Sequence, residues 1–208
     1  MSNKKTKKKR KIFTWYNIII FILVLIMIGF GTGFGIFMSY VKDAPEFDPK
    51  KLKPSETSMV FDQEGQIIAE LHGEQNRVPV PLEKIPKNLI NAFIAIEDQY
   101  FYSHKGINIR SIIGSLVTNL LHGGIKRGAS TITQQLVKTA FLSPEQAWKR
   151  KAQEAWLAVQ LERHYTKDEI MEFYLNQIYF GHSAYGVESA ADTYFGKGVD
   201  ELDLAEAA

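Results

Sequence analysis

The 208-residue sequence contains no cysteine, so disulfide bonds are excluded and the fold must depend on burial of an apolar core. Proline is nearly absent after residue 87, where Pro144 is the only one. Proline interrupts helices, and the apolar residues of this part recur at helical spacing. We therefore predict a mainly α-helical domain of about 120 residues, without internal repeats.

Charged residues are absent from residues 12–41, directly after a strongly basic start. A helix of these 30 residues is about 45 Å long, more than the roughly 30 Å hydrocarbon core of a bilayer. A cleaved signal peptide has a shorter apolar region and a small-residue cleavage site, which is not found here. We predict a single membrane span over residues 12–41, with interfacial aromatic residues Trp15, Tyr16 and Tyr40.

Basic residues are scarce once the N-terminal tail, residues 1–11, is set aside. The tail holds seven of the 25 lysines and arginines, which leaves 18 basic against 23 acidic residues. Nucleic-acid binding requires clustered basic residues in the folded part, so no nucleic-acid partner is predicted. The tail instead indicates topology and contact with anionic lipid: its charge places the N-terminus in the cytoplasm and everything after Lys42 outside.

Composition predicts a linker and a hairpin between the span and the helical domain. Residues 42–57 carry three prolines and many charges, which is typical of an extended stalk. Two short extended segments, 58–61 and 66–71, flank a turn-forming Asp62 and Gly65. We predict a small hairpin region over residues 58–84, followed by the main domain over residues 85–208.

A first candidate for acid–base chemistry ends a predicted helix over residues 87–100. Glu97 follows Phe93 by four residues and Ile90 by seven, so it shares their apolar face. A carboxylate on the core side of a helix suits a general base or acid that lines a cleft. The alternative is a helix-end glutamate bonded to backbone donors.

A second candidate, Glu154, lies on a helix predicted from a start signal at residues 143–146 to about His164. Arg150 shares its face, and Lys151 precedes it by three residues. Glu154 is either a second site carboxylate or one partner of an exposed salt bridge.

Between these helices lies a glycine-rich, basic loop over residues 121–128, which leads into the hydroxyl and amide side chains of residues 130–135. A helix predicted to start there has free backbone N–H groups, which with hydroxyls and the nearby Lys138 form an anion site. The loop lacks the Gly-Lys-Ser/Thr ending of a phosphate loop. The alternative makes Ser130 a helix N-cap and the glutamines a solvated face.

Four segments in succession carry a family resemblance. They are Glu-Asp-x-x-Phe-x-x-His-x-Gly at 97–106, Gly-Ala-Ser-Thr-Ile-Thr-Gln-Gln-Leu-Val-Lys at 128–138, Arg-Lys-Ala-Gln-Glu at 150–154, and Lys-Asp-Glu-Ile-Met-Glu-Phe-Tyr-Leu-Asn at 167–176 with Tyr-Phe-Gly at 179–181. In this order they resemble the motifs of family 51 peptidoglycan glycosyltransferases, the domain of class A penicillin-binding proteins and monofunctional transglycosylases.

The resemblance implies a lysozyme-like α lobe with a smaller membrane-proximal jaw whose lipid-facing surface dips into the bilayer. It implies polymerisation of lipid II into β-1,4 glycan strands with release of undecaprenyl diphosphate. The expected partners are lipid II, the growing glycan strand, the bacterial plasma membrane, and division or elongation proteins. A divalent cation, magnesium or manganese, is the expected cofactor.

Carried over by motif, the resemblance makes Glu97 the base and Glu154 the second carboxylate. The implied substrate-binding residues are Asp98, Phe101, His104, Arg127, Ser130, Thr131, Thr133, Gln134, Gln135, Lys138, Arg150, Lys151 and Asn176. One departure is that Gly114 and Ser115 stand where many members carry arginine and alanine, so an expected cation is missing there or replaced by Arg110 or Arg127.

The last residues, 204–208, have helical composition without a stop signal, so we expect a longer protein. Matches to Ser-x-x-Lys at 2–5 and 39–42 lie in the tail and the membrane flank without a Lys-Thr-Gly partner, so they predict no transpeptidase. Two alternative functions stay open. One is a lytic or hydrolytic glycosidase, which does not need a basic diphosphate site. The other is a non-catalytic, membrane-anchored cell-wall scaffold.

Overall fold

The computed structural model describes residues 7–52, 58–61, 67–71, 76–124, 128–143 and 147–208. The chain divides into two compact units, Met1–Asp43 and Ala44–Ala208. The first unit contains one long helix, α1 (Lys7–Lys42). Its segment Trp15–Lys42 has 28 residues and a mean hydropathy of 2.6, and it is long and apolar enough to cross a membrane. The predicted apolar N-terminal helix is confirmed.

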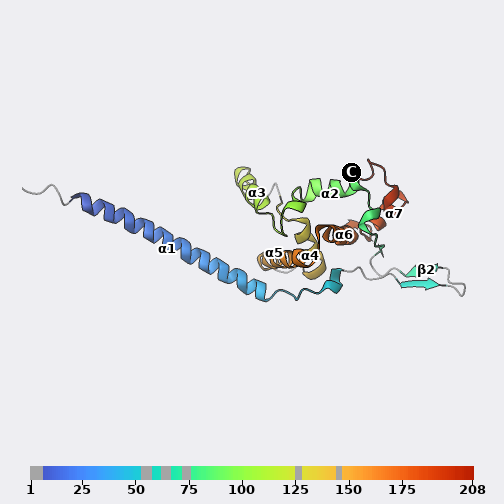
Figure 1. Ribbon diagram of the computed structural model, residues 1–208, viewed down its shortest axis with the longest axis horizontal. Helices are drawn as coiled ribbons and strands as arrows, with labels where there is room; N and C mark the ends of the chain where they lie inside the picture. Colours follow the sequence, from blue (N-terminus) through green and yellow to red (C-terminus); the bar gives the residue numbers. More distant parts are fainter. Residues whose placement is uncertain (1–6, 53–57, 62–66, 72–75, 125–127, 144–146) are drawn as a thin grey trace, which may run out of the picture. The chain divides into compact units, whose positions relative to one another are not determined.

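The second unit is mainly helical, as predicted (Figure 1). Its α-helices are α2 (Lys87–Glu97), α3 (Ile109–Leu121), α4 (Ile132–Phe141), α5 (Ala147–His164), α6 (Lys167–Gln177) and α7 (Val187–Phe195). Short 3₁₀ helices are η1 (Pro49–Leu52), η2 (Leu82–Lys84), η3 (Phe101–Ser103) and η4 (Val199–Glu201). The predicted hairpin is confirmed as the antiparallel pair β1 (Ser58–Phe61) and β2 (Ile67–Leu71).

A second, three-stranded sheet has the order β3 (Asn76–Arg77), β5 (Ala184–Tyr185), β4 (Tyr179–Gly181). Strands β3 and β5 are parallel, and β5 and β4 are antiparallel. The sheet brings the chain before α2 next to the chain after α6. It therefore ties the two ends of the helical region together.

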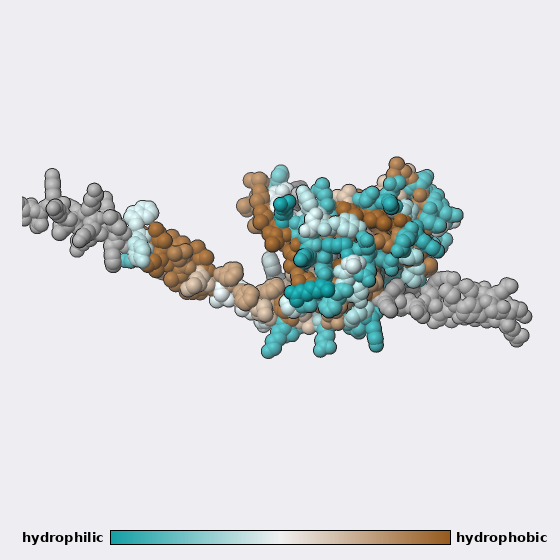
Figure 2. Space-filling model, in the orientation of Figure 1, coloured by the Kyte–Doolittle hydropathy of each residue, from teal (hydrophilic) through white to brown (hydrophobic). Residues whose placement is uncertain are grey.

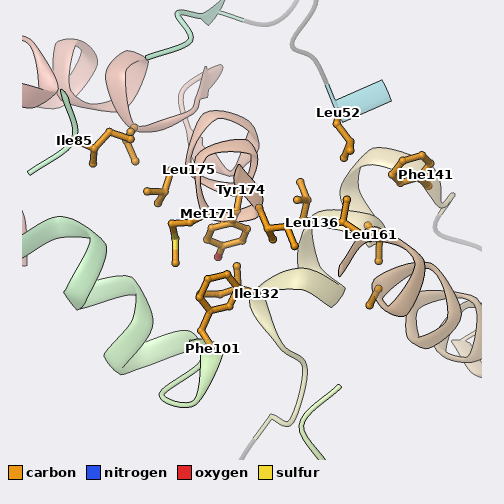
Figure 3. Close-up of a cluster of buried hydrophobic side chains, with 14 of the residues drawn as sticks. Leu52, Ile85, Phe101, Ile132, Leu136, Phe141, Leu161, Met171, Tyr174 and Leu175 are labelled. Carbon is orange, nitrogen blue, oxygen red and sulfur yellow. The ribbon is translucent and has the colours of Figure 1, made fainter. Parts of the chain in front are cut away.

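The core of the second unit is built around α4, which packs against both α5 and α6 (Figure 3). The apolar side of α4 contributes Ile132, Leu136, Val137 and Phe141, and these are met by the following residues of η3, α5 and α6: Phe101, Leu157, Leu161, Ile170, Met171, Tyr174 and Leu175. Burial of each such side chain stabilises the fold by about 1.5 to 3 kcal/mol. Because α4 starts directly after residues 128–131, this core fixes that segment in place.

Residues 44–52 pack on the rest of the second unit, which corrects the described part of the predicted extended stalk (residues 42–57); residues 53–57 lie outside the described residues. The ring of Phe47 lies 5.5 Å from that of Phe141 and 5.1 Å from that of His164, centroid to centroid. Leu52 of η1 is fully buried, and its carbonyl oxygen accepts a 2.7 Å hydrogen bond from Gln177 Nε2. The prolines do exclude a long helix here, but two apolar side chains are enough to bind the segment to the core.

Two predicted helix ends are also corrected. Helix α2 ends at Glu97 rather than at Tyr100, because the backbone of Asp98 leaves the helical region at φ −156° and ψ 76°. The N-cap of α4 is Thr131 rather than Ser130, and Thr131 forms a capping box with Gln134. The predicted start signal of α5 includes Pro144 and Gln146, which lie outside the described residues.

Helix α3 carries an exposed apolar surface at the edge of the second unit (Figure 2). Its exposed apolar residues are Ile109, Ile112, Ile113, Leu116, Val117, Leu120 and Leu121, of which Leu120 reaches 81% exposure. No other described element packs closely along this helix. A continuous apolar patch of this kind marks an interaction site.

Candidate active site

A cavity of about 390 Å³ lies between the end of α2 and the segment that precedes α4. One wall contains Glu97, Asp98 and Tyr100, and the other contains residues 128–131 and Gln135. The two motif segments at 97–106 and 128–138 therefore meet at one cleft, as the sequence predicts for a shared site. A larger cavity of about 710 Å³ is lined instead by parts of η3, the end of α5 and the start of α6.

Glu97 is exposed in this cleft, which corrects the expectation that its carboxylate faces the core. Ile90 and Phe93 of α2 pack against the core as predicted, but Ile96 is 76% exposed. The helix ends at Glu97, and no described element covers its last turn, so the apolar face is left open there. Gln135 Nε2 donates a 2.8 Å hydrogen bond to Glu97 Oε2. The carboxylate is thus held by α4 while it remains open to a ligand.

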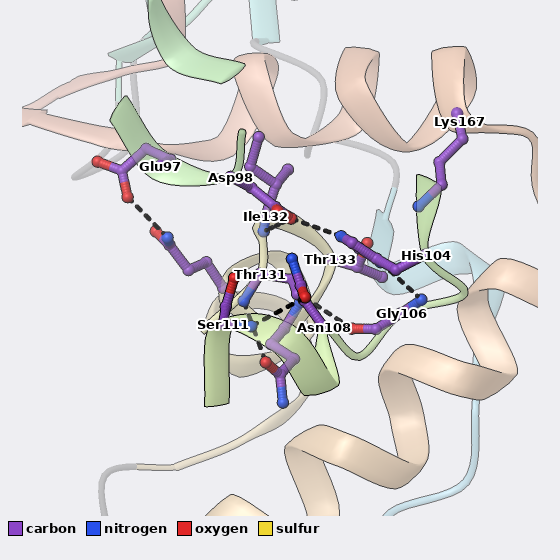
Figure 4. A network of polar contacts seen from close by, with 12 residues as sticks. Glu97, Asp98, His104, Gly106, Asn108, Ser111, Thr131, Ile132, Thr133 and Lys167 are labelled. Carbon is purple, nitrogen blue, oxygen red and sulfur yellow. Dashed lines mark hydrogen bonds and ion pairs between the residues drawn. The ribbon is translucent and has the colours of Figure 1, made fainter. Parts of the chain in front are cut away.

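Asp98 is the carboxylate that points inward (Figure 4). Its Oδ2 atom accepts a 3.2 Å hydrogen bond from the backbone N–H of Ile132 and lies 2.7 Å from His104 Nε2. This places a negative charge at the N-terminus of α4, where the helix dipole favours it. Asp98 therefore fastens the end of α2 to the start of α4, next to Glu97.

The same contacts correct the predicted anion site of free backbone N–H groups. The N–H of Ile132 bonds to Asp98, the N–H of Thr131 donates to Gln134 Oε1 at 3.0 Å, and the N–H of Gln134 donates to Thr131 Oγ1 at 3.1 Å. A helix start that already holds a carboxylate and a capping box leaves few backbone donors for a ligand. Nearby hydroxyl and cationic side chains are therefore the main candidates for recognition of an anion.

Positive charge reaches the cleft from α5. Lys151 Nζ donates 2.7 Å hydrogen bonds to Ser130 Oγ and to Glu154 Oε2, and Arg150 Nε lies 3.5 Å from Glu154 Oε1. The side chain of Glu154 is only 5% exposed, whereas that of Lys151 is 47% exposed. The predicted salt bridge exists, but its carboxylate is buried instead of exposed. Glu154 holds both cations, and the half-exposed Lys151 contacts Ser130, which lines the cleft.

Behind the cleft lies a buried charged network that the sequence did not single out. Glu162 Oε1 accepts from Thr133 Oγ1 at 2.7 Å and from Lys167 Nζ at 2.6 Å, and it lies 3.9 Å from His104 Nδ1. Burial lowers the pKa of Lys167, and its hydrogen bond to Glu162 acts in the opposite direction. The network links α4, α5 and α6 to His104, and His104 in turn contacts Asp98. It therefore helps to hold Asp98 in position.

Several predicted substrate-binding residues lie inside the protein instead of along the cavity. Phe101 is fully buried in the core, and Thr133 and Gln134 bond to Glu162 and Thr131 respectively. Asn176 bonds to both backbone groups of Val80. Such side chains offer no surface to a ligand, so their surroundings indicate support of the site. Lys138 is exposed, and Arg127 lies outside the described residues.

Three further residues position the cleft and were missed by sequence reasoning. Ser115, the second residue of the Gly114-Ser115 pair that departs from the family pattern, donates a 2.9 Å hydrogen bond to the carbonyl of Gly128. The carbonyl of Gly106 accepts a 2.7 Å hydrogen bond from Thr131 Oγ1. Tyr174 OH donates to Gln135 Oε1 at 3.3 Å. Each is a contact distant in sequence, which spacing within one helix does not reveal.

The residues of the cleft do not by themselves form a metal site. Among the described residues, no group of three or more His, Cys, Asp or Glu side chains could hold a metal ion. Glu154 is paired with two cations, and Asp98 with His104 and the N–H of Ile132. The donors of the described residues thus do not by themselves fit a resident divalent cation.

The sequence from residue 64 to residue 208 matches the model of the family described as Transglycosylase. The chain belongs to the transglycosylase family. This confirms the resemblance drawn from the four motifs. The cleft described above is lined mainly by two of those motif segments, and Lys151 of a third contacts its wall at Ser130.

Curated relatives of this transglycosylase chain are penicillin-binding proteins. Penicillin-binding protein 1A of Streptococcus oralis is 42% identical over 179 residues, which cover 85% of this chain and 28% of that protein. Penicillin-binding protein 1A/1B of Bacillus subtilis (strain 168) is 44% identical over 195 residues, or 94% of this chain and 21% of that protein. Penicillin-binding protein 1A of Escherichia coli (strain K12) is 48% identical over 149 residues, or 72% and 17%. The chain spans less than a third of the length of these relatives.

Proposed function

We propose that this chain is a membrane-anchored peptidoglycan glycosyltransferase that polymerises lipid II into β-1,4 glycan strands and releases undecaprenyl diphosphate. The observation that carries the proposal is the cleft in which an exposed carboxylate, Glu97, faces a segment held by Lys151. Family membership supports the reaction class, and the cleft supports the placement of its parts.

In the proposed reaction, the 4-hydroxyl of the acceptor sugar attacks the anomeric carbon of the growing chain. The bond from that carbon to the diphosphate oxygen breaks as the new C–O bond forms, with inversion to the β-1,4 linkage. Glu97 accepts the proton of the attacking hydroxyl, because among the described residues that line the cleft it is the exposed carboxylate. The Gln135 amide holds the carboxylate toward the cavity.

The departing diphosphate needs cations close to where its negative charge increases. Lys151 lies against Ser130 at the cleft wall, with Arg150 beside it on α5 and exposed Lys138 on α4. Glu154 fixes the first two of these and does not donate a proton itself, since it accepts a hydrogen bond from Lys151 and forms an ion pair with Arg150. A divalent cation held mainly by the diphosphate is compatible with this arrangement, but no step is assigned to it.

We predict that Lys151→Met raises the lipid II concentration for half-maximal rate about tenfold, the effect of losing one charge-assisted hydrogen bond. The matched control is Lys105→Met, since Lys105 lines the other cavity. Initial rates of polymer formation against lipid II concentration measure the effect. If the rate depends on lipid II concentration in the same way in the two variants, Lys151 does not bind the diphosphate.

The proposed placement at the membrane uses two apolar surfaces. Helix α1 anchors the chain with its basic tail in the cytoplasm and the second unit outside, by the positive-inside rule. Separately, the exposed apolar side of α3 resembles that of a helix lying in the bilayer interface. A lipid-linked substrate then reaches the cleft from the outer leaflet.

We predict that α3 contacts acyl chains. Because the chain has no cysteine, Leu120→Cys carries a single fluorescent label in vesicles containing the full chain. Brominated lipids are expected to quench this label strongly, whereas a label at Glu201→Cys, on the acidic η4 helix, stays bright. Equal quenching at the two positions would contradict membrane contact by α3.

Incubation of the purified chain with labelled lipid II tests the proposed function as a whole. Polymer with release of undecaprenyl diphosphate supports it. Release of sugar fragments from finished cell wall, without polymer, would favour a glycosidase. Binding of lipid II without either product would favour a scaffold.

A further inference from the structure

The amide of Gln135 bridges two side chains that come from different helices. Its Nε2 atom donates to Glu97 Oε2 at 2.8 Å, and its Oε1 atom accepts from Tyr174 OH at 3.3 Å. Glu97 ends α2, Gln135 lies in α4, and Tyr174 lies in α6. The three groups form one hydrogen-bonded line from the core to the cleft.

The amide has two faces that differ in chemistry, since one end donates and the other accepts. Only the nitrogen end can donate to a carboxylate, and the reverse orientation sets an amide oxygen against a negative charge. A hydrogen-bond donor that is fixed next to the amide oxygen favours the orientation in which the amide nitrogen points to the carboxylate. Tyr174 is such a donor, because its side chain is anchored in the core and its ring packs edge-on against Phe93 at 5.9 Å.

We infer that Tyr174 is a positioning residue for the reaction: it orients the Gln135 amide so that the amide nitrogen holds Glu97 toward the acceptor sugar. The inference rests on the proposed role of Glu97 as the base. Tyr174 itself does not line the cavity, so it acts only through Gln135.

The electrostatic surroundings keep Tyr174 in the donating form. Burial raises the pKa of its hydroxyl, and the negative charge of Glu97 raises it further. The hydroxyl therefore stays protonated at neutral pH and can donate to Gln135.

A double-mutant cycle tests the relay in the full chain reconstituted in vesicles. Tyr174→Phe keeps the ring and removes the hydroxyl, and it is expected to lower kcat about fivefold to tenfold with KM unchanged. In a Gln135→Met background the same change is expected to have no effect beyond about twofold, because the intermediary is gone. A Tyr174→Phe loss that is equally large in both backgrounds would overturn the relay, since it would indicate a structural role.

The matched control is Tyr102→Phe, which also removes a tyrosine hydroxyl bonded to α6, here to Asp168 Oδ1 at 3.1 Å. It is expected to leave kcat unchanged, because this hydrogen bond does not involve Gln135 or Glu97.

A second readout does not depend on activity. With ¹⁵N-labelled glutamine, the side-chain amide signals of Gln135 are expected to shift and to exchange faster with water in Tyr174→Phe but not in Tyr102→Phe. Unchanged Gln135 signals in Tyr174→Phe would overturn the relay. Full turnover by Glu97→Gln together with shifted Gln135 signals would instead overturn the proposed function of Glu97 and leave the contact standing.

Discussion

Replacing Glu97 with glutamine is expected to abolish polymerisation of lipid II, with a fall in kcat of at least about 10³-fold, within the range for loss of a general base. Glutamine has nearly the same shape, and its oxygen can still accept from the Gln135 amide, so geometry is retained. It cannot accept the proton of the attacking hydroxyl. The rate is measured as incorporation of labelled lipid II at saturating substrate.

The fold is expected to survive this change, because Glu97 is exposed and lies outside the core. We expect Glu97→Gln to have the same midpoint of thermal unfolding as the wild type and to bind lipid II equally well. Glu83→Gln, at another exposed acidic position in η2, is the matched control and should retain full turnover. Normal polymerisation by Glu97→Gln would show that another group is the base.

Replacing Gly106 with alanine is expected to destabilise the second unit by about 3 to 5 kcal/mol, since two unfavourable terms combine. The backbone of Gly106 has φ +89°, which favours glycine. A Cβ atom added there would lie 2.7 Å from the carbonyl oxygen of Ala158 and 2.8 Å from its carbon, both in the backbone of α5. Neither atom can move without shifting the helix.

The structural change caused by Gly106→Ala is also expected to reach the cleft, because the carbonyl of Gly106 accepts a hydrogen bond from Thr131, the N-cap of α4. Thermal unfolding followed by circular dichroism measures the effect. Gly124→Ala is the control, since nothing lies within 4 Å of its added Cβ and its φ is ordinary. If the two variants unfold at the same temperature, the close packing of the 97–106 segment on α5 is not a feature of the protein in solution.

Local patterns in the sequence were sufficient for much of the fold. The uncharged run of residues 12–41 gave the long apolar helix, because length and composition alone determine it. Helical spacing and start signals placed α2, α5 and the start of α4 to within a few residues, and turn-forming residues placed the β1–β2 hairpin. The motifs placed the cleft, since both of its walls are motif segments.

Local sequence patterns could not predict contacts between residues that lie far apart in the sequence. Helical periodicity put Glu97 on the core side, but it could not show that the helix ends there and that Asp98 turns inward instead. The prediction that the start of α4 offers free backbone N–H groups was wrong for a similar reason, because the acceptor of the Ile132 N–H comes from 34 positions earlier. The prolines before the hairpin indicated an extended stalk. Phe47 of this segment instead packs against the rings of Phe141 and His164, which lie about a hundred positions later, and no local sequence pattern predicts that contact.

Photo-crosslinking tests most directly whether the cleft between α2 and α4 is where the sugar units react. Lipid II with a photoreactive group on its sugar is bound to the full Glu97→Gln chain in vesicles, irradiated, and the labelled peptides are mapped by mass spectrometry. We predict adducts within residues 95–100 and 128–135, which line the smaller cavity. Adducts confined to residues 102–105 and 159–167, around the larger cavity, would contradict this placement of the active site.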